Sequence, residues 1–232
     1  MTAGMTAQTI AKPPAQAPRG RMRTYVSAYD RLAQLPVVFT INTMVRATGM
    51  DRASARVLLT RWAGKKMVES AGPRTGIYFN RVADRNGASA HAVRALTMKY
   101  PSATLCGASV LHSAGWTTQI PSTLHVAVEA RNSYSRFDGV TLHPRRRSWF
   151  QRMQKHGAWI DAGDAAAAGE MTSYGLRALA PAWALADLYA DQSGRSWQPH
   201  EDDLDVPQAA LPALRIACAA LHSKPPFDIA DH

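Results

Sequence analysis

Residues 40–66 read TINTMVRATGMDRASARVLLTRWAGKK, and this segment governs the fold expected for the first third of the chain. Thr40 is a candidate N-cap, and apolar residues recur at helical spacing after it. Gly49 is expected to end that helix, because glycine adopts the left-handed conformation of helix C-termini without steric cost. Asp51 is a second candidate N-cap, and a longer helix follows it to the end of the segment. Two helices joined by so short a turn predict a helix-turn-helix.

The residues on either side of this segment extend the pattern. Apolar side chains at helical spacing predict a further helix over residues 24–33, which stops before Pro36. Two short strand-like runs, 67–70 and 77–79, flank a turn rich in Gly and Pro, and they predict a β-hairpin directly after the second helix. Together these elements predict a winged helix-turn-helix domain over residues 23–80.

Charge is unevenly distributed along the chain of 232 residues. The 27 Lys and Arg outnumber the 17 Asp and Glu, for a formal net charge of +10. Residues 1–89 hold 14 basic and 4 acidic side chains, whereas residues 90–232 hold 13 of each. A cationic N-terminal module beside a neutral remainder predicts a nucleic-acid partner for the N-terminal part. Double-stranded DNA is the partner that a winged helix favours.

The second helix of the motif carries its arginines opposite an apolar stripe. Arg52, Arg56 and Thr60 lie on that face and are the expected base-reading residues, since Arg is the commonest reader of guanine. The alternative is a solvated cationic face with lysines favoured by the helix dipole. The other expected DNA contacts are basic or hydroxyl residues that would meet phosphates: Thr40, Thr43, Arg46, Lys65, Lys66, Arg74 at the hairpin turn, and Arg21 and Arg23 ahead of the first helix.

Three further segments complete the expected organisation. Residues 1–22 are rich in Ala, Thr, Pro and Gln, which predicts a flexible basic tail, an arm that reaches DNA phosphates or a minor groove, or both. Residues 81–89 are polar and are expected to be a linker. Residues 90–232 alternate helical and strand-like patterns and predict a mixed α+β domain, so the fold class of the whole chain is α+β. Helices are expected at about 90–100, 107–114, 181–190 and 207–222, and strands at 103–106, 123–129, 139–143, 158–161 and 176–179.

Motifs for catalysis, cofactors and membrane insertion are missing from the sequence. It contains neither GxxxxGK[ST] nor GxGxxG, and no GxSxG surrounds Ser109, which precedes His112 by three residues. The two cysteines form no CxxC pair, which argues against zinc and suits a reducing cytoplasm. No apolar run approaches the ~18 residues of a membrane span. We therefore expect a cytoplasmic protein that is no enzyme and holds no cofactor or metal.

Two charged segments in the C-terminal part each allow more than one interpretation. Arg145–Arg147, followed by Trp149 and Phe150, could hold a nucleic-acid backbone and stack on bases. The alternative, which the neutral charge of this part favours, is a surface loop anchored by its aromatic residues. The acidic run Glu201–Asp205 fits a divalent cation site, a solvated loop or the acid-rich first turn of a helix.

The order of several motifs resembles the AbiEi family of antitoxins, which belong to type IV toxin–antitoxin pairs. The N-terminal match is to the winged helix-turn-helix of that family, and two later matches are to its C-terminal domain. The residues that carry the resemblance are Thr48–Met50, Ala55–Leu59, Arg61–Val68, Gly76–Tyr78, Tyr100-Pro101, Cys106–Trp116, Ile120-Pro121, Thr172–Leu176 and Ala184–Leu188.

The resemblance implies a function. Members bind inverted repeats in the promoter of their own operon and repress it, and their C-terminal domain counteracts a nucleotidyltransferase-like toxin without a stable complex. It also implies an antitoxin-domain motif of Ser109, His112 and Asp187. Two alternatives remain: a winged-helix regulator whose C-terminal domain senses a ligand or binds a partner, and a phosphoryl- or acyl-transfer activity in the second domain.

Overall fold

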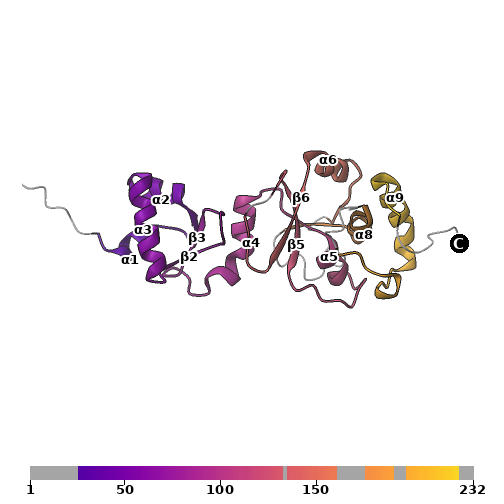
Figure 1. The fold of residues 1–232 in the computed structure, drawn as a ribbon, viewed down its shortest axis with the longest axis horizontal. Coiled ribbons are helices and arrows are strands. Elements are labelled where there is room, and N and C mark those ends of the chain that lie inside the picture. Colours follow the sequence, from indigo (N-terminus) through magenta and orange to yellow (C-terminus); the bar gives the residue numbers. More distant parts are fainter. Residues whose placement is uncertain (1–25, 133–134, 161–175, 191–196, 225–232) are drawn as a thin grey trace, which may run out of the picture.

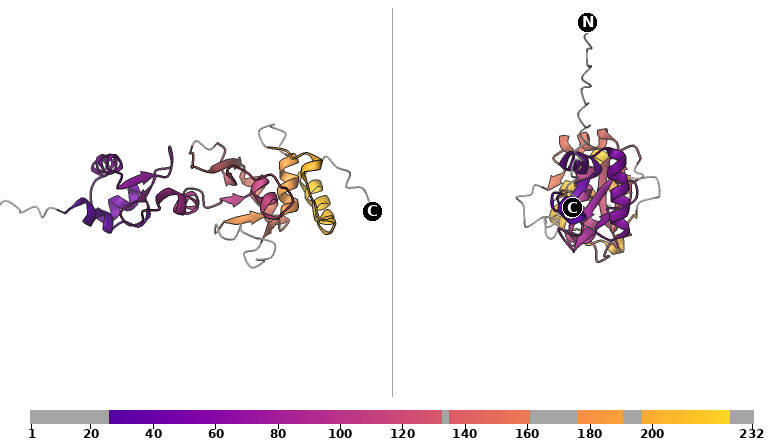
Figure 2. Two further views of the ribbon diagram at one scale, coloured as in Figure 1. Left: turned by 90° about the horizontal axis from the view of Figure 1, so that it is seen from below. Right: turned by 90° about the vertical axis from the view of Figure 1, so that its left-hand side faces the viewer.

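A computed structural model describes residues 26–132, 135–160, 176–190 and 197–224 of the chain. It contains helices and strands in the mixture expected for the α+β class. The molecule is elongated, with α3 (Arg52–Gly64) near one end and α9 (Leu211–Leu221) near the other (Figures 1 and 2). Two β-sheets lie between these ends, and each organises its own group of helices.

The N-terminal sheet and its helices follow the expected order of a helix, two helices separated by a short turn, and a hairpin. Its three antiparallel strands are arranged β1-β3-β2, with Val38 opposite Phe79 and Val68 opposite Asn80. Its elements are α1 (Ala28–Ala33), β1 (Val38–Thr40), α2 (Ile41–Thr48), α3, β2 (Val68–Ser70) and β3 (Ile77–Asn80).

Local capping fixes both ends of the turn between α2 and α3. The side chains of Thr40 and Thr43 form a reciprocal capping box at the start of α2. Gly49 ends α2 with a φ of 67°, in the left-handed region. The Asp51 carboxylate accepts hydrogen bonds from the backbone N–H groups of Ala53 and Ser54, both at 2.9 Å. These observations confirm Thr40 and Asp51 as N-caps and Gly49 as the end of the first helix.

Asn80 connects the first helix to the sheet. Its buried side-chain amide donates to the carbonyl oxygens of Leu32 at 2.8 Å and Leu35 at 3.2 Å. Its Oδ1 atom accepts from the backbone N–H groups of Val82 and Ala83, at 3.2 Å each. One side chain therefore forms hydrogen bonds with four backbone groups at this junction.

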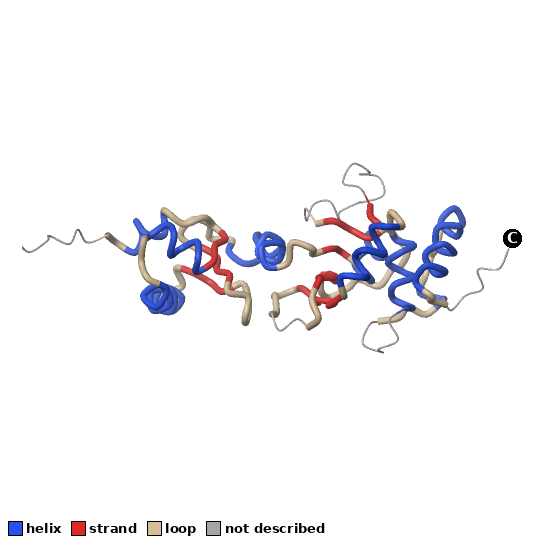
Figure 3. The backbone as a smooth tube through the Cα atoms, turned by 90° about the horizontal axis from the view of Figure 1, so that it is seen from above, coloured by secondary structure: helices blue, strands red, loops and turns tan. Residues whose placement is uncertain are grey.

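The helix that follows corrects the expected linker. Residues 81–89 were expected to join two domains, but α4 (Gly87–Lys99) already begins within them. Ala95 and Leu96 of α4 are fully buried in one cluster with Val38 and Ile77 of the N-terminal sheet. Figures 1 and 3 both place α4 between the two sheets. The helix therefore covers the first sheet instead of only opening the second domain.

The second sheet contains five strands in the order β6-β5-β4-β8-β7. The β5–β6 and β4–β8 pairs are parallel, whereas β4–β5 and β7–β8 are antiparallel. Helix α5 contacts β5 and α8, and α8 contacts α9, so helices cover this sheet in successive layers. The elements are β4 (Thr104–Leu105), α5 (Gly107–Ser113), β5 (Leu124–Glu129), β6 (Val140–Arg145), α6 (Arg147–Lys155), β7 (Trp159–Ile160), β8 (Arg177–Leu179), α8 (Pro181–Ala190) and α9, with 3-10 turns at Glu201–Asp203 and Gln208–Ala210.

Most of these elements match the expected ranges, and α6 is the exception. The segment after Arg145–Arg147 was interpreted as a surface loop, but residues 147–155 are helical. Trp149, Phe150 and Met153 follow the spacing i, i+1, i+4 and turn inward, with Met153 fully buried. The prediction that aromatic residues anchor this segment to the core was therefore correct, whereas the prediction that the segment is a loop was wrong.

The hairpin turn between β2 and β3 contacts residues 135–137, which precede β6 of the second sheet. Ser135 donates its hydroxyl to the carbonyl oxygen of Arg74 at 3.1 Å, and the Arg136 N–H donates to that of Pro73 at 3.3 Å. Gly72 has a φ of 133°, and a Cβ there would lie 1.9 Å from the Arg136 carbonyl oxygen. Only glycine permits this close approach, which fastens the turn to residues 135–137.

We expect Asn80→Ala to destabilise the protein by about 2 kcal/mol, because the fully buried Asn80 amide would no longer bond the backbone of residues 32, 35, 82 and 83. Urea unfolding followed by circular dichroism measures this change. Asn42→Ala is the matched control: Asn42 is exposed on α2, and its loss should change stability by less than about 0.5 kcal/mol. Equal effects of the two substitutions would contradict the role of Asn80.

Candidate nucleic-acid interface

The outer face of α3 carries the residues expected to read bases. Arg52, Arg56 and Thr60 are all exposed, at positions i, i+4 and i+8 of the helix. Ala55 and Trp62 on the opposite face are buried in the N-terminal core. The Thr60 hydroxyl donates to the Arg56 carbonyl oxygen at 3.1 Å, so it retains acceptor capacity toward solvent. The two arginines therefore project together from a rigid helix.

The acidic side chains of this part of the chain are held in local contacts. Asp30 accepts hydrogen bonds from the N–H and hydroxyl groups of Ser27 in the capping box of α1, and Asp51 caps α3. Glu69 pairs with Arg81 at 2.8 Å, and Asp84 contacts the ring of His91 at 2.7 Å. In the part of the chain that the structure describes, none of these carboxylates pairs with an arginine of α3. The charge of the α3 face is consequently uncompensated.

The cap at Asp51 remains ionised under ordinary conditions. Hydrogen bonds from the Ser54 hydroxyl and backbone N–H, together with that of Ala53, lower the pKa of Asp51 below its usual value of 3.8. A negative charge at this helix end is also favoured by the helix dipole. The start of α3, and with it the position of Arg52, is thus held firmly at neutral pH.

The residues expected to contact phosphates differ in how exposed they are and in whether their polar groups are already hydrogen-bonded. Arg46, Lys65 and Lys66 are exposed near the C-terminal ends of α2 and α3. Thr40 and Thr43 are half-buried, and their hydroxyl oxygens lie 3.1 Å apart within the capping box. One hydroxyl proton is used between them, so the pair can donate only one hydrogen bond outward.

Arg74 has an exposed side chain but a tethered backbone. Its φ of 59° places it in the left-handed region, and its carbonyl oxygen accepts from Ser135. The hairpin turn is therefore not a free loop, although the guanidinium can still extend away from it. Arg21 and Arg23 lie outside the described residues.

Two residues on the same outer face were not selected from the sequence. Val57 is 52% exposed, although valine is an apolar residue, and Arg61 is exposed one turn further along α3. A methyl-bearing side chain on such a face suits contact with the methyl group of thymine. The sequence alone could have identified Val57, because this apolar residue falls outside the apolar stripe of its helix.

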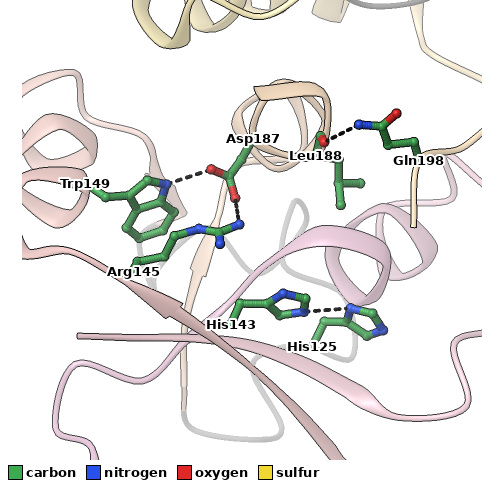
Figure 4. Close-up of polar contacts among 7 residues, drawn as sticks. All are labelled: His125, His143, Arg145, Trp149, Asp187, Leu188 and Gln198. Carbon is green, nitrogen blue, oxygen red and sulfur yellow. Dashed lines mark hydrogen bonds and ion pairs between the residues drawn. The ribbon is translucent and has the colours of Figure 1, made fainter. Parts of the chain in front are cut away.

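The three residues of the expected antitoxin-domain motif occupy separate sites. The Ser109 hydroxyl is buried and accepts from the His125 backbone N–H at 2.8 Å. The buried Nδ1 atom of His112 has no hydrogen-bond partner among the described residues. Asp187, 5% exposed on α8, accepts from Arg145 at 3.0 Å and from Trp149 Nε1 at 2.7 Å (Figure 4). No nucleophile–base arrangement therefore joins these three side chains.

Two histidines on the neighbouring strands β5 and β6 lie beside this ion pair. The rings of His125 and His143 stack with centroids 5.1 Å apart, and His143 Nε2 lies 3.1 Å from His125 Nδ1 (Figure 4). Burial lowers the pKa of His125 below its usual 6.5. Nearby, burial and then the charge of Asp187 raise the pKa of the Cys106 thiol to about 12, so this cysteine stays protonated and unreactive.

The part of the chain that the structure describes offers neither a cluster of metal ligands nor a membrane-spanning helix. Within the described ranges, no group of three or more His, Cys, Asp and Glu side chains is placed to hold a metal ion. The acidic run forms a 3-10 turn capped by His200, with Glu201 and Asp202 exposed. None of the helices that the structure describes is long and apolar enough to cross a bilayer.

Comparisons with known proteins give a distant likeness to a solved structure. No protein-family model matches the chain, and no curated protein matches it. Among solved structures, the chain is similar to the RV2827C protein from Mycobacterium tuberculosis, with a TM-score of 0.47 and 16% sequence identity. The match covers 82% of this chain and 66% of that chain, so this chain spans less than two thirds of its length. At this level of similarity the likeness carries no functional information.

Asp187→Ala should lower the free energy of unfolding by about 3 kcal/mol, because it removes the carboxylate that pairs with the largely buried Arg145 guanidinium. Asp187→Asn should cost less, since an amide oxygen can still accept from Trp149. Chemical denaturation of both variants distinguishes these effects. An Asp187→Ala protein as stable as the wild type would show that the pair does not organise this site.

The His125 pKa predicts how stability depends on pH. A histidine whose pKa is lowered in the folded state binds its proton more readily when unfolded, so stability falls as pH decreases below about 6.5. His125→Gln should flatten this decrease between about pH 6.5 and pH 5. His222→Asn, at an exposed helix end, is the control and should leave the decrease unchanged. Identical pH profiles for wild type and His125→Gln would contradict the assignment.

Proposed function

We propose that this chain is a double-stranded-DNA-binding protein whose N-terminal part acts as a winged helix-turn-helix. The observation that carries the proposal is the outer face of α3, where Arg52 and Arg56 are exposed and pair with no carboxylate of the described residues. A helix of this width fits the major groove, and the N-terminal half of such a helix is the part that meets base edges.

The proposed contacts divide into two kinds. Arg52, Arg56 and Thr60 read bases, with Val57 available to a thymine methyl group. The second kind comprises the phosphate contacts, which position the protein without reading sequence. They are Thr40, Thr43, Arg46, Lys65, Lys66 and Arg74, with Arg21 and Arg23 as further candidates ahead of the described residues.

A narrower proposal follows from the resemblance to the AbiEi antitoxins. In it, the chain binds inverted repeats in its own promoter, represses its operon, and counteracts a nucleotidyltransferase-like toxin through the C-terminal part without a stable complex. The proposal rests on the sequence motifs, among them the segments around Ser109 and Asp187. A toxin-like reading frame next to the gene would support it.

The alternative is a DNA-binding regulator whose C-terminal part senses a ligand or binds a partner. The fastening of the hairpin turn to residues 135–137 favours it, because a change in the C-terminal sheet could then reach the DNA-binding part. A ligand that binds the folded protein would raise its thermal midpoint, so a thermal-shift screen tests this alternative.

Arg56→Ala should weaken binding to the native upstream duplex by about 1–3 kcal/mol and should have little effect on a scrambled duplex. Lys65→Ala should weaken both duplexes alike and reduce the salt dependence by about one phosphate contact. Gel shifts at several salt concentrations measure both effects. Arg94→Ala, an exposed arginine on α4, serves as a control for the loss of one charge.

Equal losses for Arg56→Ala on both duplexes would refute the base-reading role, although DNA binding itself would stand. The full chain carrying both Arg52→Ala and Arg56→Ala tests whether promoter repression and toxin neutralisation can be separated. This variant should lose repression of its promoter while still rescuing growth in cells that express the neighbouring toxin. Loss of rescue in a folded variant would contradict a division of labour between the two parts.

A further inference from the structure

A cavity with an arginine-rich lining lies in the C-terminal part, away from α3. It has a volume of about 670 Å³ and opens where β5 and β6 end and α6 begins. Arg131 approaches it from the end of β5, whereas Arg146 and Arg147 line it from the start of α6. Glu129 is the acidic residue in its lining.

The three arginines have their charges available. Arg131, Arg146 and Arg147 are exposed, and their side chains make no ion pair or hydrogen bond within the described chain. The neighbouring Arg145 differs, because its guanidinium is engaged by Asp187 and lies 5.9 Å from the centre of the Trp149 ring. That arrangement anchors the start of α6, so the adjacent arginines are displayed from a fixed backbone.

A second cavity adjoins the first. Its volume is about 700 Å³, and it shares Arg147 and Glu129 with the first cavity. Its other lining residues include the rings of Phe150 and Trp159 and the cation Lys155. We call the two cavities together the α6 cleft. Its cationic half and its aromatic half meet at Arg147.

We propose that the α6 cleft is a binding site for a phosphate-bearing nucleotide, either free or as part of a single strand of nucleic acid, with its phosphate held by Arg131, Arg146 and Arg147. Planar guanidinium groups bind phosphate through paired hydrogen bonds, and they converge here in a concave site. The N-terminal turn of α6 also lines this cavity, and the positive end of a helix dipole favours an anion. Phe150 in the adjoining cavity offers a ring on which a base can stack.

The volume of the α6 cleft and the positive charge of its lining fit this ligand. Each cavity falls in the range of about 300–1,000 Å³ that holds small-molecule ligands. One carboxylate, Glu129, faces three unpaired guanidinium groups, so the cationic half attracts an anion. The proposal does not depend on DNA binding by α3, since the residues of the two sites are different.

Isothermal titration of the full chain at about 100 mM salt tests the proposal with three probes: inorganic triphosphate, ATP and a short single-stranded DNA. The strand is also titrated into the Arg52→Ala/Arg56→Ala chain, which removes any contribution from α3. Arg147→Gln should weaken binding at least about tenfold, the loss expected for a charge-assisted hydrogen bond. Arg152→Gln is the matched control, because Arg152 is exposed on the same helix and lines neither cavity.

The three probes distinguish the source of the phosphate. Equal affinities for triphosphate and ATP indicate a site for the phosphate alone, whereas tighter binding of ATP or of the strand indicates that the base is also held. Glu129→Gln should strengthen binding by removing repulsion. The proposal is overturned if no probe binds saturably, if both arginine substitutions weaken binding equally, or if Glu129→Gln weakens it. Thermal midpoints confirm that each variant is folded.

Discussion

Burial of Ala55, Leu59 and Trp62 against the N-terminal core is the contact on which the proposed DNA surface depends. A helix has one rotational setting that buries such a stripe, and this setting directs Arg52 and Arg56 into solvent. The Asp51 and Gly49 caps fix where the helix begins. The nearby carboxylates of Glu69 and Asp84 contact Arg81 and His91 instead of α3. The outer face of α3 is therefore cationic as a consequence of how the helix packs.

The two parts of the chain are joined more closely than their compositions indicate. Helix α4 buries Ala95 and Leu96 against the first sheet, and the hairpin turn is hydrogen-bonded to residues 135–137. The N-terminal part and the C-terminal part therefore share a contact at Gly72, where no side chain fits. A functional division between them would have to operate across this junction, which gives a physical route for one part to influence the other.

Local features were predictable, whereas long-range ones were not. Thr40, Gly49 and Asp51 were identified because caps depend on a few neighbouring residues. Helix α6 was missed because its arginines and glutamines obscure the spacing of Trp149, Phe150 and Met153. The contacts of Asp187 with Arg145 and Trp149 were not predicted, because they join side chains that lie about 40 residues apart in the chain and meet only through packing. The contact between Gly72 and Arg136 left no local signal at all.

Nuclear magnetic resonance of the full chain with the DNA duplex from upstream of its gene tests the central claim most directly. The backbone signals of α3 and the Nε–Hε signals of Arg52 and Arg56 report on the outer face, and those of Arg94 on α4 serve as the internal reference. Our account predicts that the α3 signals shift progressively with added duplex while the Arg94 signal does not move. Unchanged α3 signals in a sample where the duplex is bound would contradict it.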